Sequence, residues 1–231
     1  MKSSRFAGRG RAATPDPLAR LRPATHADAD QIGRLVATAL ADKVAPAFGD
    51  RGAHAIAALV RRDLPRSAVR YVVAESGGTI VGTTRLALRQ EAAEAGIRPI
   101  AHAIGWRHAL RGAVVLGLLA HARLAPDEAY VEELAVSADR RRHGIGRSLL
   151  LECESIARHA GKHRITLWVT AGNVGAVALY RSLGYRVARR RRTLRGRLLF
   201  GAPLALLMEK PLGAGAAILS SDAAHSETGR S

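Results

Sequence analysis

The sequence has little cysteine, few aromatic residues and no long apolar run, and each shortage excludes a class of protein. Cys153 is the only cysteine in 231 residues, which excludes a disulfide-stapled scaffold and a zinc site built on cysteines. The longest apolar stretch, residues 113–120, is far shorter than the roughly 20 residues of a membrane span, so we expect no stable membrane insertion. Because no apolar run follows the basic first residues, we also expect no secretory signal and a cytoplasmic location.

Acidic residues are also scarce. Lys and Arg number 36 against 19 Asp and Glu, which gives a net charge of +17 and excludes an acidic disordered protein. Seven of the arginines lie in residues 186–197, a segment without an acid. Such a segment attracts anions, including nucleic acid, but it has no aromatic side chain to stack on single-stranded bases. Since GC-rich coding alone produces an excess of arginine, we favour a solvated basic hairpin here.

Composition divides the chain into three parts. Residues 1–17 and 213–231 are rich in small, polar or basic residues, which predicts a disordered basic arm and a disordered tail. Residues 18–212 alternate strand-like and helix-like patterns, which predicts one α/β domain with helices on the faces of its sheet.

Hydrophobic periodicity, caps and turn residues predict the individual elements. The expected helices are 26–42 (capped by Thr25), 52–62, 105–121, 144–160 (closed by Gly161) and 173–183. The expected strands are 18–22 at a sheet edge, 69–74, 79–88, 129–136, 164–170, 185–190 and 204–210, with a tight turn at residues 76–78. Residues 89–128 are too long for a plain loop, and the 105–121 helix within them is either a packed surface helix or a lid over a site.

The sharpest chemical pattern is a strand, a basic turn and a helix that opens with glycines. The strand 131–136 is followed by Arg141-Arg142-His143-Gly144-Ile145-Gly146-Arg147-Ser148. The first turn of a helix has free N–H groups and a positive dipole end, and glycine lets a phosphate approach them. The pattern therefore predicts a pyrophosphate site. Its spacing matches neither a dinucleotide-binding G-x-G-x-x-G nor a P-loop.

Two blocks resemble those of the GCN5-related N-acetyltransferase (GNAT) family. Arg141-x-x-Gly144-x-Gly146 after a Val-ending strand is similar to the coenzyme A signature of that family. The second block, similar to the family's Asn-x-x-Ala-x-x-Leu-Tyr-x-x-x-Gly-aromatic segment, comprises Asn173, Ala176, Leu179, Tyr180, Gly184 and Tyr185. The resemblance extends over about residues 19–212. It implies a mixed, mostly antiparallel sheet of roughly six to seven strands flanked by helices. Residues 89–128 would then be a helical insertion between the third and fourth strands.

The resemblance also implies an activity, the direct transfer of acetyl from acetyl-CoA to a primary amine in a ternary complex, without a metal. In the family the pyrophosphate lies on the turn, and the pantetheine arm pairs with the preceding strand, where a bulge splays that strand from the next. The residues thereby assigned to acetyl-CoA are Leu134, Ala135, Val136, Arg141, Arg142, His143, Gly144, Ile145, Gly146, Arg147, Ser148, Asn173 and Tyr180.

Three side chains are candidate catalytic groups. An amine with a pKa of about 10.4 must lose a proton, and either water or one of the carboxylates Glu132 and Glu133 can accept it. Because side chains alternate along a strand, we expect the two glutamates to face opposite sides. We favour Glu132, which lies where family members often place an acceptor-facing polar residue. Tyr180 can protonate the departing thiolate. The alternative for each glutamate is a structural carboxylate paired with an arginine, and the alternative for Tyr180 is a packed aromatic ring without a catalytic role.

Other functions remain open from the sequence. The main alternative is a non-catalytic module with the acyl-CoA fold that binds nucleic acid or another polyanion through its Arg-rich hairpin. A third reading is a peripheral membrane protein that uses the 105–121 helix. The acceptor amine could be a small molecule, a peptide or a protein, and the sequence does not specify the oligomeric state. Cys153 lies on the apolar side of its helix and is expected to be a buried thiol.

Overall fold

The computed structural model describes residues 19–89, 98–119, 124–192 and 204–213, and its centre is a seven-stranded sheet. The strands are β1 (Arg20–Pro23), β2 (Val69–Ser76), β3 (Thr79–Ala87), β4 (Glu128–Val136), β5 (Arg164–Thr170), β6 (Arg186–Arg192) and β7 (Leu204–Pro211). Their order is β1-β2-β3-β4-β5-β7-β6, and among them β4 and β5 are the parallel pair. The expected mixed, mostly antiparallel sheet is confirmed, with β1 and β6 as its edges.

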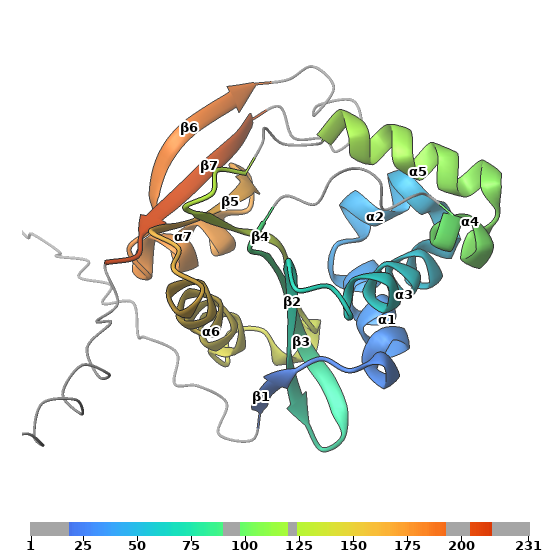
Figure 1. The fold of residues 1–231 in the computed structure, drawn as a ribbon, viewed down its shortest axis with the longest axis horizontal. Coiled ribbons are helices and arrows are strands. Elements are labelled where there is room, and N and C mark those ends of the chain that lie inside the picture. Colours follow the sequence, from blue (N-terminus) through green and yellow to red (C-terminus); the bar gives the residue numbers. More distant parts are fainter. Residues whose placement is uncertain (1–18, 90–97, 120–123, 193–203, 214–231) are drawn as a thin grey trace, which may run out of the picture.

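Helices lie on both sides of this sheet (Figure 1). On one side are α6 (Ile145–His159) and α7 (Val174–Ser182). On the other side are α1 (Ala29–Ala39), α2 (Ala41–Phe48), α3 (Gly52–Asp63), α4 (Arg98–Ile104) and α5 (Trp106–Leu119). Each side has its own apolar core. Ile32, Val60 and Val73 are buried on the α1–α3 side, and Leu150, Ile165 and Met208 are buried on the α6–α7 side.

The first helical segment differs from the prediction of one helix over residues 26–42. The structure has a short turn, η1 (His26–Asp28), then α1, and α2 begins at Ala41. The break lies at Leu40, whose φ of −120° and ψ of 35° are outside the helical region. Thr25 does open the segment, because its N–H and hydroxyl donate to Asp28 Oδ2 at 2.7 and 2.9 Å.

The two hairpins are placed as expected. Gly77 and Gly78 have φ values of 56° and 76°, and a two-residue type I′ turn requires positive φ at both positions. β6 and β7 form the second hairpin, the Arg-rich one. The segment that joins them, the arm at residues 1–17 and nearly all of the tail at 213–231 lie outside the described residues.

The insertion between β3 and β4 contains two helices, whereas the sequence predicted one. α4 and α5 are separated by Gly105 at a φ of 84°, and Ile100 and Ile104 of α4 belong to the core on the α1–α3 side. A Cβ on Gly112 of α5 would lie 2.1 Å from the Phe48 ring, so this close contact with α2 requires glycine. No helix in the described part of the chain is long and apolar enough to cross a membrane.

Candidate active site

A turn with two left-handed residues joins β4 to α6. Arg142 has a φ of 69° and Gly144 a φ of 83°. Glycine adopts this conformation without steric cost, whereas Arg142 is held there against the preference of an L-residue. Strained backbone of this kind is common at ligand sites. The side chains of Arg141, Arg142 and His143 are exposed on this turn, so its cationic groups are accessible to a ligand.

The first turn of α6 presents free backbone donors beside these side chains. The first hydrogen bond across the helix start runs from the Ser148 N–H to the Gly144 carbonyl at 3.0 Å. The amides of Ile145, Gly146 and Arg147 therefore have no acceptor within the helix, and no side chain caps them. Three free N–H groups at the positive end of a 15-residue helix form an anion site.

The end of β4 is open on its β5 side. Pairing between the two parallel strands starts at Glu128 opposite Arg164 and ends at Val131 opposite Leu167. β4 continues to Val136 and β5 to Thr170 without further pairing to each other. The backbone groups of residues 132–136 on this edge are therefore available to an extended ligand. This is the splay that the resemblance implied.

The turn, the open end of β4 and α7 meet at Gly146. A Cβ built on this glycine would lie 3.4 Å from Leu179 Cδ2 of α7. It would also lie 3.8 and 3.9 Å from Val136 and Leu134 of β4. The turn and the end of β4, two groups of predicted cofactor residues, thus adjoin each other and meet α7 through Leu179, a residue that the cofactor prediction did not include. The Ala135 side chain is buried on the opposite side of the sheet, so only its backbone is available at this end of β4.

A β-bulge in β4 overturns the expectation that Glu132 and Glu133 face opposite sides. Arg85 of β3 lies opposite Glu133, and the next pair is Leu86 with Val131, so Glu132 is the extra residue. Before the bulge, Ala129 and Val131 are buried on the α6–α7 side; after it, Ala135 is buried on the α1–α3 side. Because the alternation changes phase between them, both glutamates lie on the α1–α3 face.

The two carboxylates nevertheless have different surroundings. Glu132 forms an ion pair with Arg85 and is partly exposed. The Oε1 atom of Glu133 is buried without a hydrogen-bond partner. Loss of hydration raises the pKa of Glu133 to about 7; the Arg85 charge opposes this shift and the Asp63 charge adds to it. Glu133 is therefore the carboxyl that can change its protonation state near neutral pH.

Asp63 and Arg85 anchor this charged cluster, and no motif in the sequence singles them out. Asp63, at the end of α3, is fully buried and accepts from Arg62 Nε at 2.6 Å and Arg85 Nη2 at 2.8 Å. The Arg85 guanidinium also lies 5.8 Å from the centre of the Tyr71 ring. These groups come from α3, β2 and β3, so their proximity is a product of the tertiary fold.

The α7 residues have structural contacts of their own. Burial raises the pKa of Tyr180 to about 12, and its ring lies 5.9 Å from the Tyr185 ring, centre to centre. Asn173 caps α7 by accepting the Ala176 N–H at 3.1 Å. The catalytic role of Tyr180 and the cofactor role of Asn173 remain predictions. Cys153 is fully buried, as expected, which raises the pKa of its thiol to about 12.

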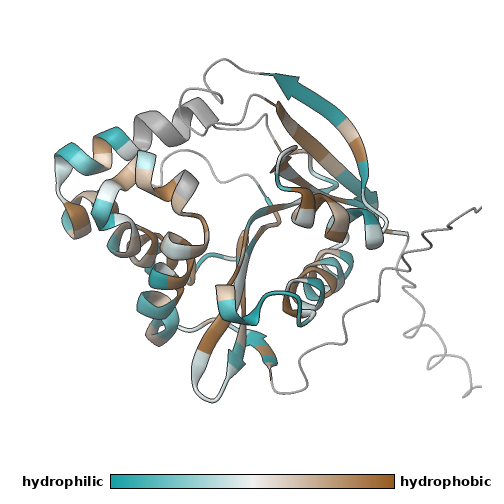
Figure 2. Cartoon of the chain, turned by 180° about the vertical axis from the view of Figure 1, so that it is seen from behind, coloured by the Kyte–Doolittle hydropathy of each residue, from teal (hydrophilic) through white to brown (hydrophobic). Residues whose placement is uncertain are grey.

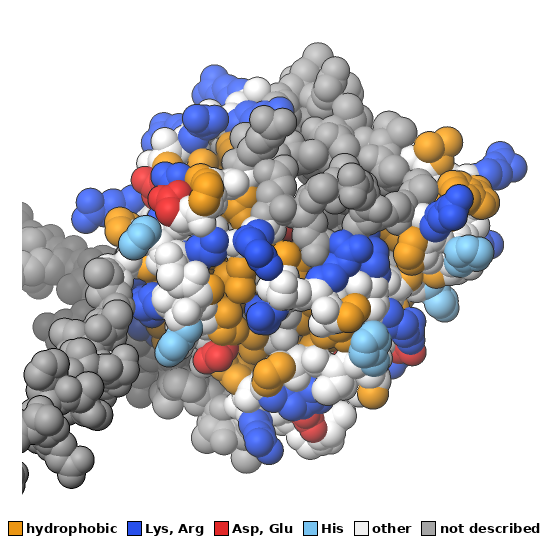
Figure 3. Space-filling view, viewed as in Figure 1, with side chains coloured by type: hydrophobic (Ala, Val, Ile, Leu, Met, Phe, Trp, Pro, Cys, Tyr) orange, Lys and Arg blue, Asp and Glu red, His pale blue; other side chains and the backbone are white. Residues whose placement is uncertain are grey.

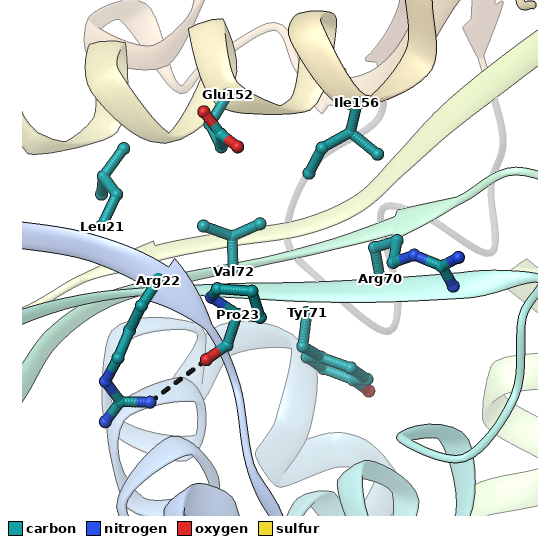
Figure 4. A pocket seen from close by; sticks show the side chains of 8 residues that line it. All are labelled: Leu21, Arg22, Pro23, Arg70, Tyr71, Val72, Glu152 and Ile156. Atoms are coloured by element: carbon teal, nitrogen blue, oxygen red, sulfur yellow. Dashed lines mark hydrogen bonds between the residues drawn. The ribbon is translucent and has the colours of Figure 1, made fainter. Parts of the chain in front are cut away.

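A pocket lies on the α6 side of the sheet, apart from the start of α6 (Figure 4). Leu21 and Val72 point from β1 and β2 toward Ile156 of α6, with Glu152 beside them. Glu152 is six residues beyond Gly146, or about 9 Å along the helix axis. No predicted site residue lines this pocket. In the described ranges, no group of three or more His, Cys, Asp and Glu side chains could hold a metal ion.

Sequence comparison relates the chain to known proteins. The Acetyltransferase (GNAT) family model matches residues 57–185. A curated relative, the [ribosomal protein bS18]-alanine N-acetyltransferase of Escherichia coli K12, is 41% identical over 66 residues. That stretch is 29% of this chain and 45% of the relative, so the chain spans less than half the length of the curated relatives it matches.

Solved structures share the fold. The ribosomal-protein-alanine N-acetyltransferase of Brucella melitensis has a TM-score of 0.57 at 21% identity and covers 84% of this chain and 99% of its own. yncA from Salmonella typhimurium, solved with its cofactor acetyl-CoA, has a TM-score of 0.58 at 20% identity, with 87% and 97% covered. At these identities the likeness concerns the fold.

Proposed function

Since the chain belongs to the Acetyltransferase (GNAT) family, we propose that it is an N-acetyltransferase that transfers acetyl from acetyl-CoA directly to a primary amine. The observation that carries the proposal is the arrangement at Gly146, where three uncapped amides of α6 adjoin the end of β4 that is unpaired on its β5 side. A diphosphate fits the first feature, and an extended arm with amide groups fits the second. Acetyl-CoA has both parts, and one relative of the same fold was solved with it.

The chain's own residues would share the work of binding. The amides of Ile145, Gly146 and Arg147 would hold the diphosphate, with Arg141 and Arg142 as exposed cations next to it. The backbone of Leu134, Ala135 and Val136 would hydrogen-bond to the pantetheine arm and orient the thioester. Acetyl-CoA supplies the activated acetyl group. A backbone N–H at the open edge of β4 would polarise the thioester carbonyl.

Glu133 is the proposed base, in place of Glu132. The amine must lose a proton to attack, and an acceptor with a pKa of about 7 is half ionised at neutral pH. Glu132 is already paired with Arg85, whereas Glu133 has a buried carboxylate oxygen without a partner. Glu132 would instead fix the position of Arg85 and offer a negative charge to the approaching ammonium group.

Tyr180 is the proposed acid. Because its pKa is raised to about 12, the phenol stays protonated throughout the working pH range and can donate to a thiolate. Replacing Tyr180 with Phe should lower kcat about 10- to 100-fold with little change in acetyl-CoA affinity. An unchanged kcat would remove Tyr180 from this role.

The identity of the acceptor amine can be sought in a defined order. The curated relative acts on the alanine of a ribosomal protein, so a peptide with an N-terminal alanine is the first acceptor to test. The insertion helices α4 and α5 lie on the same side of the sheet as Glu132 and Glu133. They would shape the acceptor site, so the acceptor of the relative need not be shared.

The test is release of the CoA thiol from acetyl-CoA in the presence of a broad panel of amines, with titration calorimetry for acetyl-CoA binding. We expect binding in the micromolar range and amine-dependent thiol release. Glu133→Gln should lose most of that release, and Glu132→Gln is the matched control on the same strand. Binding without turnover for every amine would favour the non-catalytic module instead. No binding at high micromolar concentration would contradict the proposal. The cytoplasmic location stays a prediction.

A further inference from the structure

β6 presents a row of exposed arginines at the edge of the sheet. We call Arg186, Arg189, Arg190, Arg191 and Arg192 the arginine stripe. All five side chains are exposed, and among the described residues no strand of the sheet lies beyond β6. The strand is hydrophilic next to the apolar strand β7 in Figure 2, and Figure 3 shows cationic side chains gathered over this edge. No described element therefore covers the stripe against a partner.

Acidic neighbours do not neutralise the stripe. No ion pair between described residues includes any of its arginines. Glu209 of β7 lies opposite Arg186, but the other four lie opposite Leu207, Leu206, Ala205 and Leu204. Neither β5 nor α7, the adjacent elements, contains an acid. Like charges this close repel each other, and a bound polyanion would remove that repulsion.

The stripe has two rows, one on each face of the strand. Residues opposite each other in paired strands share a face. Arg190 lies opposite Leu206, which is buried on the α6–α7 side, so Arg190 and Arg192 lie on that face. Arg189 and Arg191 then lie on the other face. Charge is thus displayed all around the outer edge of the sheet, which suits a partner that wraps or spans this edge.

From this arrangement we infer that the arginine stripe binds the phosphate backbone of a nucleic-acid duplex, independently of base sequence. Successive strand residues advance about 3.3 Å, and each strand of a duplex carries one phosphate per about 3.4 Å of axis. Because side chains alternate between the faces, each row has an arginine at every second residue, or about 6.6 Å, which matches every second phosphate along the axis of one duplex strand. Guanidinium groups also bind phosphate through paired N–H donors.

Other partners fit the stripe less well. Single-stranded nucleic acid is held by stacking on aromatic side chains, and β6 has none. A membrane surface requires apolar side chains next to the cations, and the remaining residues of β6 are Val187, which is half-buried, and Ala188. A strand edge that approaches a duplex from outside meets the phosphates rather than the base edges in the grooves, so DNA and RNA duplexes should bind alike.

The test is fluorescence anisotropy of short DNA and RNA duplexes titrated with the full chain, across about 50 to 200 mM salt. The stripe variant combines Arg189→Gln, Arg190→Gln, Arg191→Gln and Arg192→Gln. The matched control removes four exposed arginines from other elements: Arg20→Gln, Arg34→Gln, Arg98→Gln and Arg107→Gln. We expect the stripe variant to bind at least tenfold more weakly and its salt slope to fall by about 3 to 4. The control should stay within about threefold of the parent protein.

Several outcomes would overturn the inference. These are an absence of duplex binding by the parent protein at low salt, equal losses in the stripe variant and the control, and binding of anionic vesicles or polyglutamate in preference to duplexes. Thermal unfolding of each variant checks that the hairpin remains folded. Should the fourfold variant unfold, Arg190→Gln with Arg192→Gln is the smaller substitution, and it must still reduce the salt slope, by about 2.

Discussion

Arginines occupy two opposite environments in this molecule. On the α1–α3 side, Arg22, Arg61, Arg62 and Arg85 each contact a carboxylate, and two of those carboxylates, Asp28 and Asp63, are buried. On β6, five arginines are exposed and have no acidic partner among the described residues. The first group therefore stabilises the fold, and the second has a charge that remains available for binding. An excess of arginine in the composition does not distinguish these roles, because the placement of the acids decides them.

The largest effect should come from Asp63, at the centre of the arginines that are paired with carboxylates, which we call the paired group. Asp63→Asn removes the fully buried carboxylate that both Arg62 and Arg85 bind, and loss of one partner of a buried pair costs roughly 3 kcal/mol or more in unfolding free energy. Urea denaturation measures it. Asp30→Asn is the control, because Asp30 pairs with Arg61 on the surface and should contribute less than about 1 kcal/mol. Equal losses of unfolding free energy in Asp63→Asn and Asp30→Asn would contradict the distinction between buried and surface ion pairs.

The next largest effect should come from Glu133, the proposed base, which lies beside Arg85 of the paired group. Its pKa of about 7 predicts that kcat rises with pH through about pH 7, because the base must be ionised. Glu133→Gln should lower kcat about 100-fold or more and abolish this rise, whereas Glu132→Gln should keep it. Burial favours the protonated form, so the stability that Glu133 contributes is lost as pH rises from about 4.5 through 7. A pH profile that is identical in Glu133→Gln and the parent protein would exclude Glu133 as the base.

The Arg22 contacts should have an intermediate and pH-dependent effect. Arg22 binds both oxygens of Asp28, at 2.7 and 2.9 Å, and also contacts Glu75. The hydrogen bonds from Arg22 hold the pKa of Asp28 down at about 2, against 3.8 normally. Arg22→Gln should therefore cost about 1 to 3 kcal/mol at neutral pH. The difference in unfolding free energy between the parent protein and Arg22→Gln should reach its full size above about pH 4, and it should disappear as the pH falls through about 2. A difference that does not change with pH would contradict this ion pair.

The smallest effect on stability should come from the stripe itself. Replacing the four arginines from Arg189 to Arg192 with glutamine breaks no ion pair between described residues, and it relieves repulsion between like charges. The unfolding free energy of the fourfold Gln variant should lie within about 0.5 kcal/mol of that of the parent protein, or its urea midpoint should be slightly higher. A loss of several kcal/mol would show that these arginines are structural, like those of the paired group.

Local patterns in the sequence predicted much of this structure. The turn at residues 76–78, the start of α6 near Gly144 and the strand Arg164–Thr170 depend on short stretches of chain, and the structure has all three. The blocks that carry the family resemblance are local in the same sense. The mixed, mostly antiparallel character of the sheet followed from the resemblance rather than from periodicity, and the structure supplies the order of its strands.

The rest depends on contacts between distant segments. The bulge at Glu132 depends on how β4 pairs with β3, so strict alternation gave the wrong faces for the two glutamates. Asp63 and Arg85 are 22 residues apart, and neither lies in a recognisable motif. Helix α4 likewise packs into the core on the α1–α3 side through Ile100 and Ile104, a contact between distant segments.

The central claim, that the free amides at the start of α6 hold the diphosphate of acetyl-CoA, can be tested at those atoms. The measurement is the change in backbone ¹⁵N–¹H chemical shifts as acetyl-CoA is added to the full chain. The account predicts that the amides of Ile145, Gly146 and Arg147 shift most, together with those of residues 134–136. Saturable shifts confined to another surface, or no shifts at millimolar acetyl-CoA, would contradict it.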